Sequence, residues 1–192
     1  MEEGEKEEIA RLFDVNFFGP AKLIQEVLPL MRRQKSGTIV NVTSMGGIRG
    51  AVGNGWYSAA KEALELLSDT LYKECEPLGI RVLIVEPGAF RTGFFDSLHG
   101  TKQKITDYGE TAGRMHLENV GNHHDQPGNP DKAGEVLVNL VNSQKYPRRF
   151  ALGSDSQREI RREYENRLAE LAEWENLSKA SDFYERREEK RP

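Results

Sequence analysis

The sequence predicts an α/β fold in which short parallel strands alternate with amphipathic helices. Two short runs rich in β-branched residues, 39–43 and 81–85, have the composition of buried parallel strands. Between them, apolar side chains recur at helical spacing from Trp56 to about Pro77. A strand, a helix and a second strand in this order form the unit from which parallel sheets are built.

The first long element is predicted to be a helix over residues 5–34. Its apolar residues recur every three or four positions and are Ile9, Leu12, Phe13, Phe17, Leu23, Ile24, Val27, Leu28 and Met31. Gly19 and Pro20 interrupt the pattern, and a proline removes the amide that would bond the carbonyl four residues earlier. That carbonyl belongs to Asn16, so we expect a kink that leaves it free to hold a water molecule.

The second half of the chain is predicted to hold a capped helix over 129–142, a short strand over 149–152 and a charged helix that Ser154 and Asp155 cap. This last helix is predicted to end near residue 177. Its expected packing face consists of Ile160, Tyr164, Leu168, Leu171 and Trp174. Residues 91–128 lack clear periodicity and are too long for an ordinary connection, which is typical of a lid.

The composition limits the classes of function. The chain has 192 residues, a formal net charge of −4 and one cysteine, Cys75. This length fits one domain, and no basic stripe indicates a nucleic-acid interface. A single cysteine excludes an intrachain disulfide and suits a reducing compartment. No apolar run approaches the roughly 18 residues of a membrane span. We therefore expect a cytoplasmic protein with neither nucleic-acid nor membrane partners.

Three side chains with complementary chemistry lie between the first strand and the end of the next helix. Tyr57 and Lys61 are one helical turn apart, so they point from the same face. An ammonium beside a phenol lowers the pKa of the phenol, which lets tyrosine exchange protons near neutral pH. Ser44, at the end of the strand-like run, supplies a hydroxyl for a substrate carbonyl. A tyrosine and lysine at this spacing are usually surface residues; here Ser44 and the turn Pro87-Gly88 favour a site.

Together these motifs resemble those of the short-chain dehydrogenase/reductase family. The matching segments are Val15-Asn16-Phe17-Phe18-Gly19, Asn41-Val42-Thr43-Ser44, Tyr57-Ser58-Ala59-Ala60-Lys61 and Pro87-Gly88-Ala89-Phe90-Arg91-Thr92. Their order and spacing fit the family from Asn16 to Thr92, and the likeness continues more loosely to about Leu152. The resemblance implies a partial doubly wound, Rossmann-like parallel sheet flanked by helices, whose strands are equivalent to the family's last three.

The resemblance also implies a reaction, a cofactor and roles for individual residues. The reaction is hydride transfer between NAD or NADP, with NADP slightly preferred, and a ketone, aldehyde or alcohol. The implied catalytic residues are Asn16, Ser44, Tyr57 and Lys61, with Tyr57 as the general acid and base. The implied cofactor-binding residues are Tyr57, Lys61, Pro87, Gly88, Phe90 and Thr92.

The sequence contains no glycine-rich phosphate-binding turn after an early strand. The strands that would carry it need roughly 80 to 100 residues. We therefore expect residues 1–152 to be the C-terminal part of a dinucleotide-binding domain and 153–192 to be a helical extension with a charged tail. The 192 residues alone are expected to bind dinucleotide poorly, and their activity alone is doubtful. They are also expected either to self-associate through the uncovered edge of the strand at 39–43 and the helices at 5–34 and 56–77, or to be partly unfolded.

The predicted lid favours a small apolar carbonyl or alcohol substrate, although packing of the lid on the core explains its residues equally well. The apolar residues concerned are Phe90, Phe94, Phe95, Tyr108, Met115 and Leu117. His123 and His124 lack the helical spacing of a metal-binding pair, as does nearby His116, so no metal is expected.

A second function stays open beside the enzyme. Members of the family commonly pair through the helices represented here by 5–34 and 56–77. The chain could therefore be a truncated, catalytically inactive fragment that acts only as a dimerisation or interaction chain. In both cases we expect a homo-oligomer.

Overall fold

The computed structural model describes residues 1–94, 104–121 and 125–183. Its centre is a parallel sheet of three strands in the order β1, β2, β3, which are Gly37–Val42, Ile80–Pro87 and Arg149–Leu152. The third strand has the predicted bounds, and the other two differ from the predicted ranges by at most two residues at each end. The sheet and its flanking helices confirm the predicted partial Rossmann-like fold.

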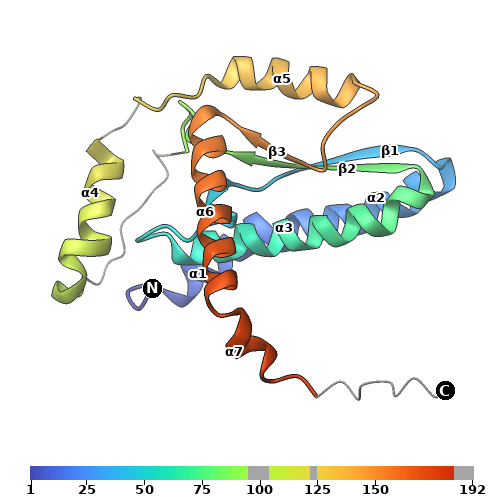
Figure 1. The fold of residues 1–192 in the computed structure, drawn as a ribbon. Helices are drawn as coiled ribbons and strands as arrows, with labels where there is room; N and C mark the ends of the chain where they lie inside the picture. Colours follow the sequence, from blue (N-terminus) through green and yellow to red (C-terminus); the bar gives the residue numbers. More distant parts are fainter. Residues whose placement is uncertain (95–103, 122–124, 184–192) are drawn as a thin grey trace, which may run out of the picture.

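Helices cover both faces of the sheet. α2 (Gly19–Gln34) and α3 (Gly55–Cys75) lie on one face, and α5 (Pro130–Asn142) lies on the other (Figure 1). Successive residues of a strand face opposite sides, so β2 supplies both cores. Its Val82 packs toward α2 and α3, whereas its Leu83 packs toward α5.

The helix predicted over residues 5–34 is divided by a π-helical turn. α1 (Lys6–Phe13) runs into the π-helix η1 (Asp14–Phe18), which leads into α2. The Gly19 amide donates to the Asp14 carbonyl, five residues back. The predicted interruption is confirmed near Pro20, but it takes the form of a π-turn rather than a simple kink, and Asn16 lies on it. Such turns insert one extra residue and re-aim the side chains around them.

The segment predicted without periodicity contains three short helical pieces. They are the 3₁₀-helix η5 (Thr106–Tyr108), the π-helix η6 (Gly109–Gly113) and α4 (Arg114–Gly121). A single bridge between Phe90 and Gly128 joins the two ends of the segment. His123, His124 and Phe95 lie outside the described residues. The predicted cap of α5 is confirmed, because the Asn129 side chain accepts from two amides of the first turn.

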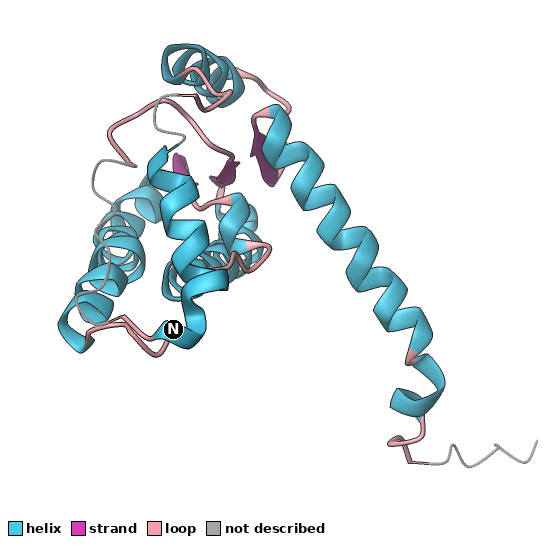
Figure 2. Ribbon diagram, turned by 90° about the vertical axis from the view of Figure 1, so that its left-hand side faces the viewer, coloured by secondary structure: helices cyan, strands magenta, loops and turns pink. Residues whose placement is uncertain are grey.

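The last helix differs from the prediction in its cap and in its packing. α6 (Ser154–Glu173) is followed by α7 (Glu175–Lys179), and Gly153 occupies the capping position with no side-chain cap. Of the predicted packing face only Ile160 is buried; Tyr164, Leu168, Leu171 and Trp174 are exposed. The physical reason is that the helix leaves the sheet after its first turns and leans away from the body (Figure 2). No helix in the described part of the chain is long and apolar enough to cross a membrane.

Candidate active site

The structure brings Ser44, Tyr57 and Lys61 together at the end of β1. The Ser44 hydroxyl accepts a hydrogen bond from the Gly46 amide at 3.0 Å and so begins a 3₁₀ turn, η2 (Met45–Gly47). Tyr57 lies in the first turn of α3, and its side chain hydrogen-bonds that of Ser44. Lys61 Nζ lies over the Tyr57 ring, 5.8 Å from its centroid. The predicted one-turn spacing therefore places both side chains beside the serine.

The electrostatics of this cluster differ from the prediction. Burial raises the pKa of Tyr57 by more than the hydrogen bond from Ser44 lowers it. Burial also lowers the pKa of Lys61, whose Nζ donates to the Val42 carbonyl at 3.0 Å. The net direction for the Tyr57 pKa is therefore opposite to the expected lowering, because desolvation of the phenolate is the largest influence.

Asn16 faces the same groove as Lys61. The groove has a volume of about 380 Å³ and runs between α2 and the open edge of β1. The Asn16 side-chain amide donates to the Leu12 carbonyl at 2.9 Å, one turn earlier, which fixes its orientation on the π-turn. The structure therefore places Asn16 and Lys61 on the walls of one groove.

The turn after β2 is held by the end of β3 and the first turn of α6. The Gly88 amide donates to the Leu152 carbonyl at 2.9 Å, and the Ala89 amide donates to Asp155 Oδ2 at 2.7 Å. A Cβ atom on Gly88 would stand only 2.1 Å from Asp155 Oδ1, so any larger residue there would displace the carboxylate. Asp155, which was predicted to cap its own helix, instead anchors the turn that follows Pro87.

Phe90 and Thr92 point to different surroundings. Phe90 lines a pocket of about 340 Å³ between the first turns of α5 and α6. The Thr92 hydroxyl accepts from the Phe94 amide at 3.2 Å. The Phe94 ring then reaches the Tyr57 ring, with 5.7 Å between their centroids. Of the predicted lid residues, Phe94 therefore lies at the cluster. Tyr108 instead donates to Glu2, and Leu117 faces solvent.

A buried ionic cluster behind Tyr57 was not predicted. The Thr43 hydroxyl donates to Glu65 Oε2 at 2.9 Å, and Arg149 Nε donates to Glu65 Oε1 at 2.6 Å. Arg149 also pairs with Asp69 at 2.9 Å. One member of the cluster, Glu65, could have been found from the sequence, because it lies two helical turns after Tyr57 on the same face of α3. The cluster ties α3 and β3 to the residue that precedes Ser44.

Glu86 on β2 should make stability depend on pH. The residue is 2% exposed, and burial beside Glu65, only partly offset by Arg149, raises its pKa to about 7. The folded state therefore favours the protonated carboxyl. The raised pKa therefore contributes to the stability of the folded state. This contribution to the free energy of unfolding is complete below the ordinary pKa of 4.5 and is lost as pH rises through about 7. We expect the free energy of unfolding of the native chain to fall by on the order of 3 kcal/mol between pH 5 and pH 8 because of this group. Glu86→Gln should abolish this fall, and urea unfolding at the two pH values measures it.

The matched control is Glu62→Gln, which removes an exposed carboxylate from α3. It should leave the pH dependence as it is in the native chain. An unchanged pH dependence in Glu86→Gln would contradict a protonated Glu86 in the folded state.

Two groups of this region could hold a nucleotide cofactor by hydrogen bonds, namely the Lys61 amine and the Tyr57 hydroxyl. Both lie at the carboxyl end of the parallel strands, where ligands of open α/β sheets bind. No group of three or more histidine, cysteine or acidic side chains placed to hold a metal occurs among residues 1–94, 104–121 and 125–183.

The chain matches a family model described as short chain dehydrogenase over residues 1–103. A curated relative, 3-ketodihydrosphingosine reductase of Bacteroides thetaiotaomicron, is 34% identical over 155 residues, which are 80% of this chain and 57% of that protein. This chain thus spans a little over half the length of that relative.

Solved structures show the same likeness. A short-chain dehydrogenase from Streptomyces avermitilis aligns with a TM-score of 0.82 and 40% identity over 95% of this chain and 65% of that one. A short chain dehydrogenase from Burkholderia cenocepacia, solved in complex with NADP, aligns with a TM-score of 0.65 and 17% identity. It covers 88% of this chain and 60% of that one, and at this identity it supports the fold alone.

Proposed function

Because this chain belongs to the short-chain dehydrogenase/reductase family, we propose that it interconverts a ketone or aldehyde and its alcohol by hydride transfer with NAD or NADP. The observation that carries the proposal is the Ser44–Tyr57 hydrogen bond with Lys61 one helical turn away. A hydroxyl that orients a phenol, next to an amine, is the arrangement needed to pass a proton to a carbonyl oxygen.

In the proposed reduction, Tyr57 gives its hydroxyl proton to the substrate oxygen and Ser44 holds that oxygen in place. The raised pKa of Tyr57 keeps the phenol protonated at neutral pH, so the side chain is ready to donate. Lys61 lies between the Tyr57 ring and the groove that Asn16 lines, and its pKa is lowered by burial. It can therefore return a proton to Tyr57 through this groove after each turnover.

Four residues of the site would hold the nicotinamide end of a dinucleotide, and one of them, Lys61, lines this groove. The Lys61 amine and the Tyr57 hydroxyl would hold the ribose, and the Phe90 backbone and the Thr92 hydroxyl would hold the carboxamide. The supporting observation is that Lys61 is half-buried at the groove wall, where its donors can meet a sugar hydroxyl. When bound, the cofactor supplies the hydride.

We propose an apolar substrate because an aromatic ring stands next to the proton donor. The Phe94 ring lies 5.7 Å from the Tyr57 ring, between centroids. A substrate oxygen at Tyr57 would then carry its organic group against Phe94, where an apolar group gains from leaving water.

The test uses the longest natural form of the protein with NADH or NADPH and matched pairs of ketones, one apolar and one carrying a carboxylate. We expect turnover with at least one cofactor and a kcat/KM at least about tenfold higher for the apolar ketone, since one large apolar contact contributes a few kcal/mol. Binding of both dinucleotides is measured in parallel by titration. Tight dinucleotide binding without turnover of any carbonyl or alcohol would contradict the proposed reaction. A preference for the charged ketone would contradict the substrate class alone.

A further inference from the structure

The end of β1 is joined to α3 by two polar contacts that start from neighbouring residues. Ser44 hydrogen-bonds Tyr57 in the first turn of the helix. The Thr43 hydroxyl donates to Glu65 Oε2 at 2.9 Å. Tyr57 and Glu65 are eight residues apart along α3, which is about 12 Å. Two contacts so far apart fix both the distance of the strand end from the helix and its angle to the helix axis.

Both residues of the second contact are buried and held by further bonds. Thr43 is 2% exposed and Glu65 is 3% exposed. The Thr43 hydroxyl also lies 3.0 Å from the Val85 carbonyl of β2, and the Thr43 amide donates to that carbonyl at 2.8 Å. The other oxygen of Glu65 accepts from Arg149 Nε at 2.6 Å. The carboxylate is therefore bound at both oxygens and cannot turn away from Thr43 without losing a buried hydrogen bond.

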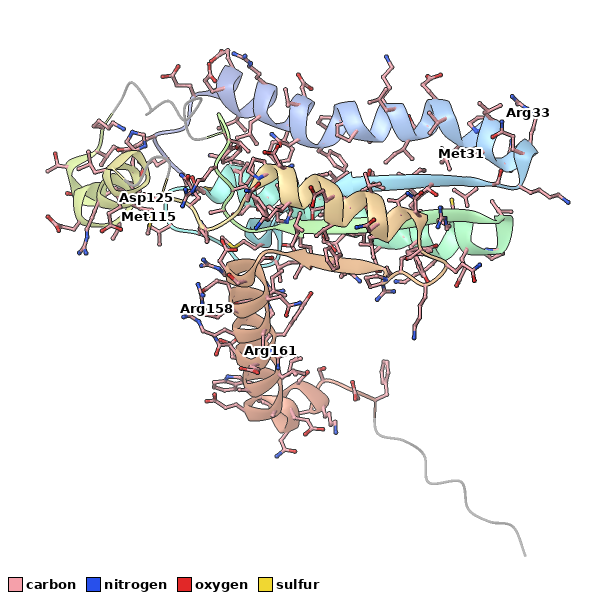
Figure 3. The ribbon with its side chains drawn as sticks, turned by 90° about the horizontal axis from the view of Figure 1, so that it is seen from above. Met31, Arg33, Met115, Asp125, Arg158 and Arg161 are labelled. Atoms are coloured by element: carbon pink, nitrogen blue, oxygen red, sulfur yellow. The ribbon has the colours of Figure 1, made fainter. Side chains whose placement is uncertain are left out.

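The start of β1 is held in a different way. A Cβ atom on Gly37, the first residue of the strand, would stand 2.6 Å from Met31 Sδ, so this side chain of α2 packs directly on the strand. Figure 3 marks Met31 at that end of β1. Apolar packing of this kind is non-directional, whereas a hydrogen bond fixes a direction. The contact that fixes direction thus lies at the end of the strand where Ser44 has to be oriented.

We propose that Glu65 is a positioning residue of the active site, which acts through Thr43 to hold the end of β1 so that the Ser44 hydroxyl stays at the Tyr57 hydroxyl. The inference rests on the proposed function, in which the serine and the tyrosine act on the substrate oxygen. Tyr57, Lys61 and Glu65 follow one another at intervals of four residues. One face of α3 therefore carries both the proton donor and the residue that positions its partner.

The hydrogen bond between Ser44 and Tyr57 can be followed without any turnover, through the pKa of Tyr57. This bond lowers the pKa of the phenol, so weakening it should raise that pKa. Fluorine NMR on the longest natural form, labelled with fluorotyrosine, measures the titration, and Tyr57→Phe assigns the signal. We expect Thr43→Val to raise the pKa of Tyr57 toward its value in Ser44→Ala, whereas Thr43→Ser should keep the native value. None of these substitutions changes a charge.

The matched control is Ser68→Ala, which breaks another buried hydrogen bond between β1 and α3. Asn41 Nδ2 donates to Ser68 Oγ at 2.7 Å, three residues beyond Glu65 on the helix. This variant should lose stability as Thr43→Val does, yet leave the pKa of Tyr57 at its native value. In a second variant, Glu65→Asp, the charge stays but the carboxylate is drawn back from Thr43 by one methylene, so the pKa of Tyr57 should again rise. An unmoved Tyr57 pKa in either variant, or an equal rise in Ser68→Ala, would overturn the proposal.

Steady-state kinetics measure the consequence for the proposed reaction. Thr43→Val should lower kcat at least about tenfold, because a misplacement of about 1 Å can cost 10²-fold, and should leave the KM for the dinucleotide within a few-fold. Thr43→Ser should restore kcat. A native kcat in Thr43→Val, or an equally low kcat in Thr43→Ser, would overturn the positioning role. If the native protein turns over no carbonyl or alcohol, the proposed reaction fails, while the pKa of Tyr57 still decides whether Glu65 positions Ser44.

Discussion

Tyr57→Phe is expected to reduce kcat for carbonyl reduction by about 10² to 10⁴, the usual cost of losing one general acid. The substitution removes only the hydroxyl, which hydrogen-bonds Ser44 and would donate the proton to the substrate oxygen. The ring, and with it the contact to Phe94, stays in place. Affinity for the dinucleotide should therefore change by only a few-fold, since Lys61 remains. Steady-state kinetics and a cofactor titration on the same preparation measure the two effects separately.

The same substitution elsewhere on α3 provides the control. Tyr72 lies on the same helix, and its hydroxyl makes one long hydrogen bond, 3.4 Å, to Glu76. Tyr72→Phe should leave kcat within about twofold of the native value, because an exposed hydrogen bond of this length contributes little. Retention of most activity by Tyr57→Phe would remove Tyr57 from the mechanism and leave the proposed roles of Ser44 and Lys61 without a proton donor.

Arg149→Met is expected to lower the free energy of unfolding by about 3 to 5 kcal/mol, the typical cost of leaving a buried charge without its partner. Arg149 Nε donates to Glu65 Oε1 at 2.6 Å, and a second nitrogen lies 2.9 Å from Asp69 Oδ1. The Glu65 residue is 3% exposed, so water cannot replace the lost guanidinium. Urea unfolding at neutral pH measures the change.

The neighbouring arginine is a matched control for this prediction. Arg148 also pairs with Asp69, but at 3.3 Å and with a side chain that is 40% exposed. Surface pairs of this kind contribute about 0 to 1 kcal/mol, so Arg148→Met should cost no more than that. In addition, Glu65→Gln should make the loss of Arg149 smaller, because the carboxylate that Arg149 compensates is then absent. Equal losses for the two arginines would contradict a structural role of the buried cluster.

Residues close together in the sequence were predicted well, and the physical reason is local geometry. The four-residue spacing of Tyr57 and Lys61 fixes both side chains on one face of α3 before any tertiary contact is made. Asn129 forms its predicted cap because its side chain reaches amides only two and three residues away. Short β-branched runs predicted two of the three strands, β1 and β2, and the order of strands in a parallel sheet follows from the connections between them.

The form of the helix interruption and the direction of the Tyr57 pKa were less accessible from the sequence. Gly19 and Pro20 indicated that the helix is disturbed, but the backbone can respond with a kink or with a π-turn, and packing on α3 and the sheet selects between them. The pKa of Tyr57 depends on how far the phenol is removed from water. No spacing rule measures that burial.

By itself, the sequence determined the α/β class, the bounds of α5 and β3, and the placement of Ser44, Tyr57 and Lys61 at the carboxyl end of the sheet. Only the tertiary structure decided which distant side chains support that end of the sheet. Thr43 and Glu65 are 22 residues apart, Ala89 and Asp155 are 66 apart, and Glu65 and Arg149 are 84 apart. It also decided that most of the predicted packing face of α6 meets solvent rather than the core. Periodicity fixes which side chains share a face of a helix, whereas the path of the whole chain fixes what that face meets.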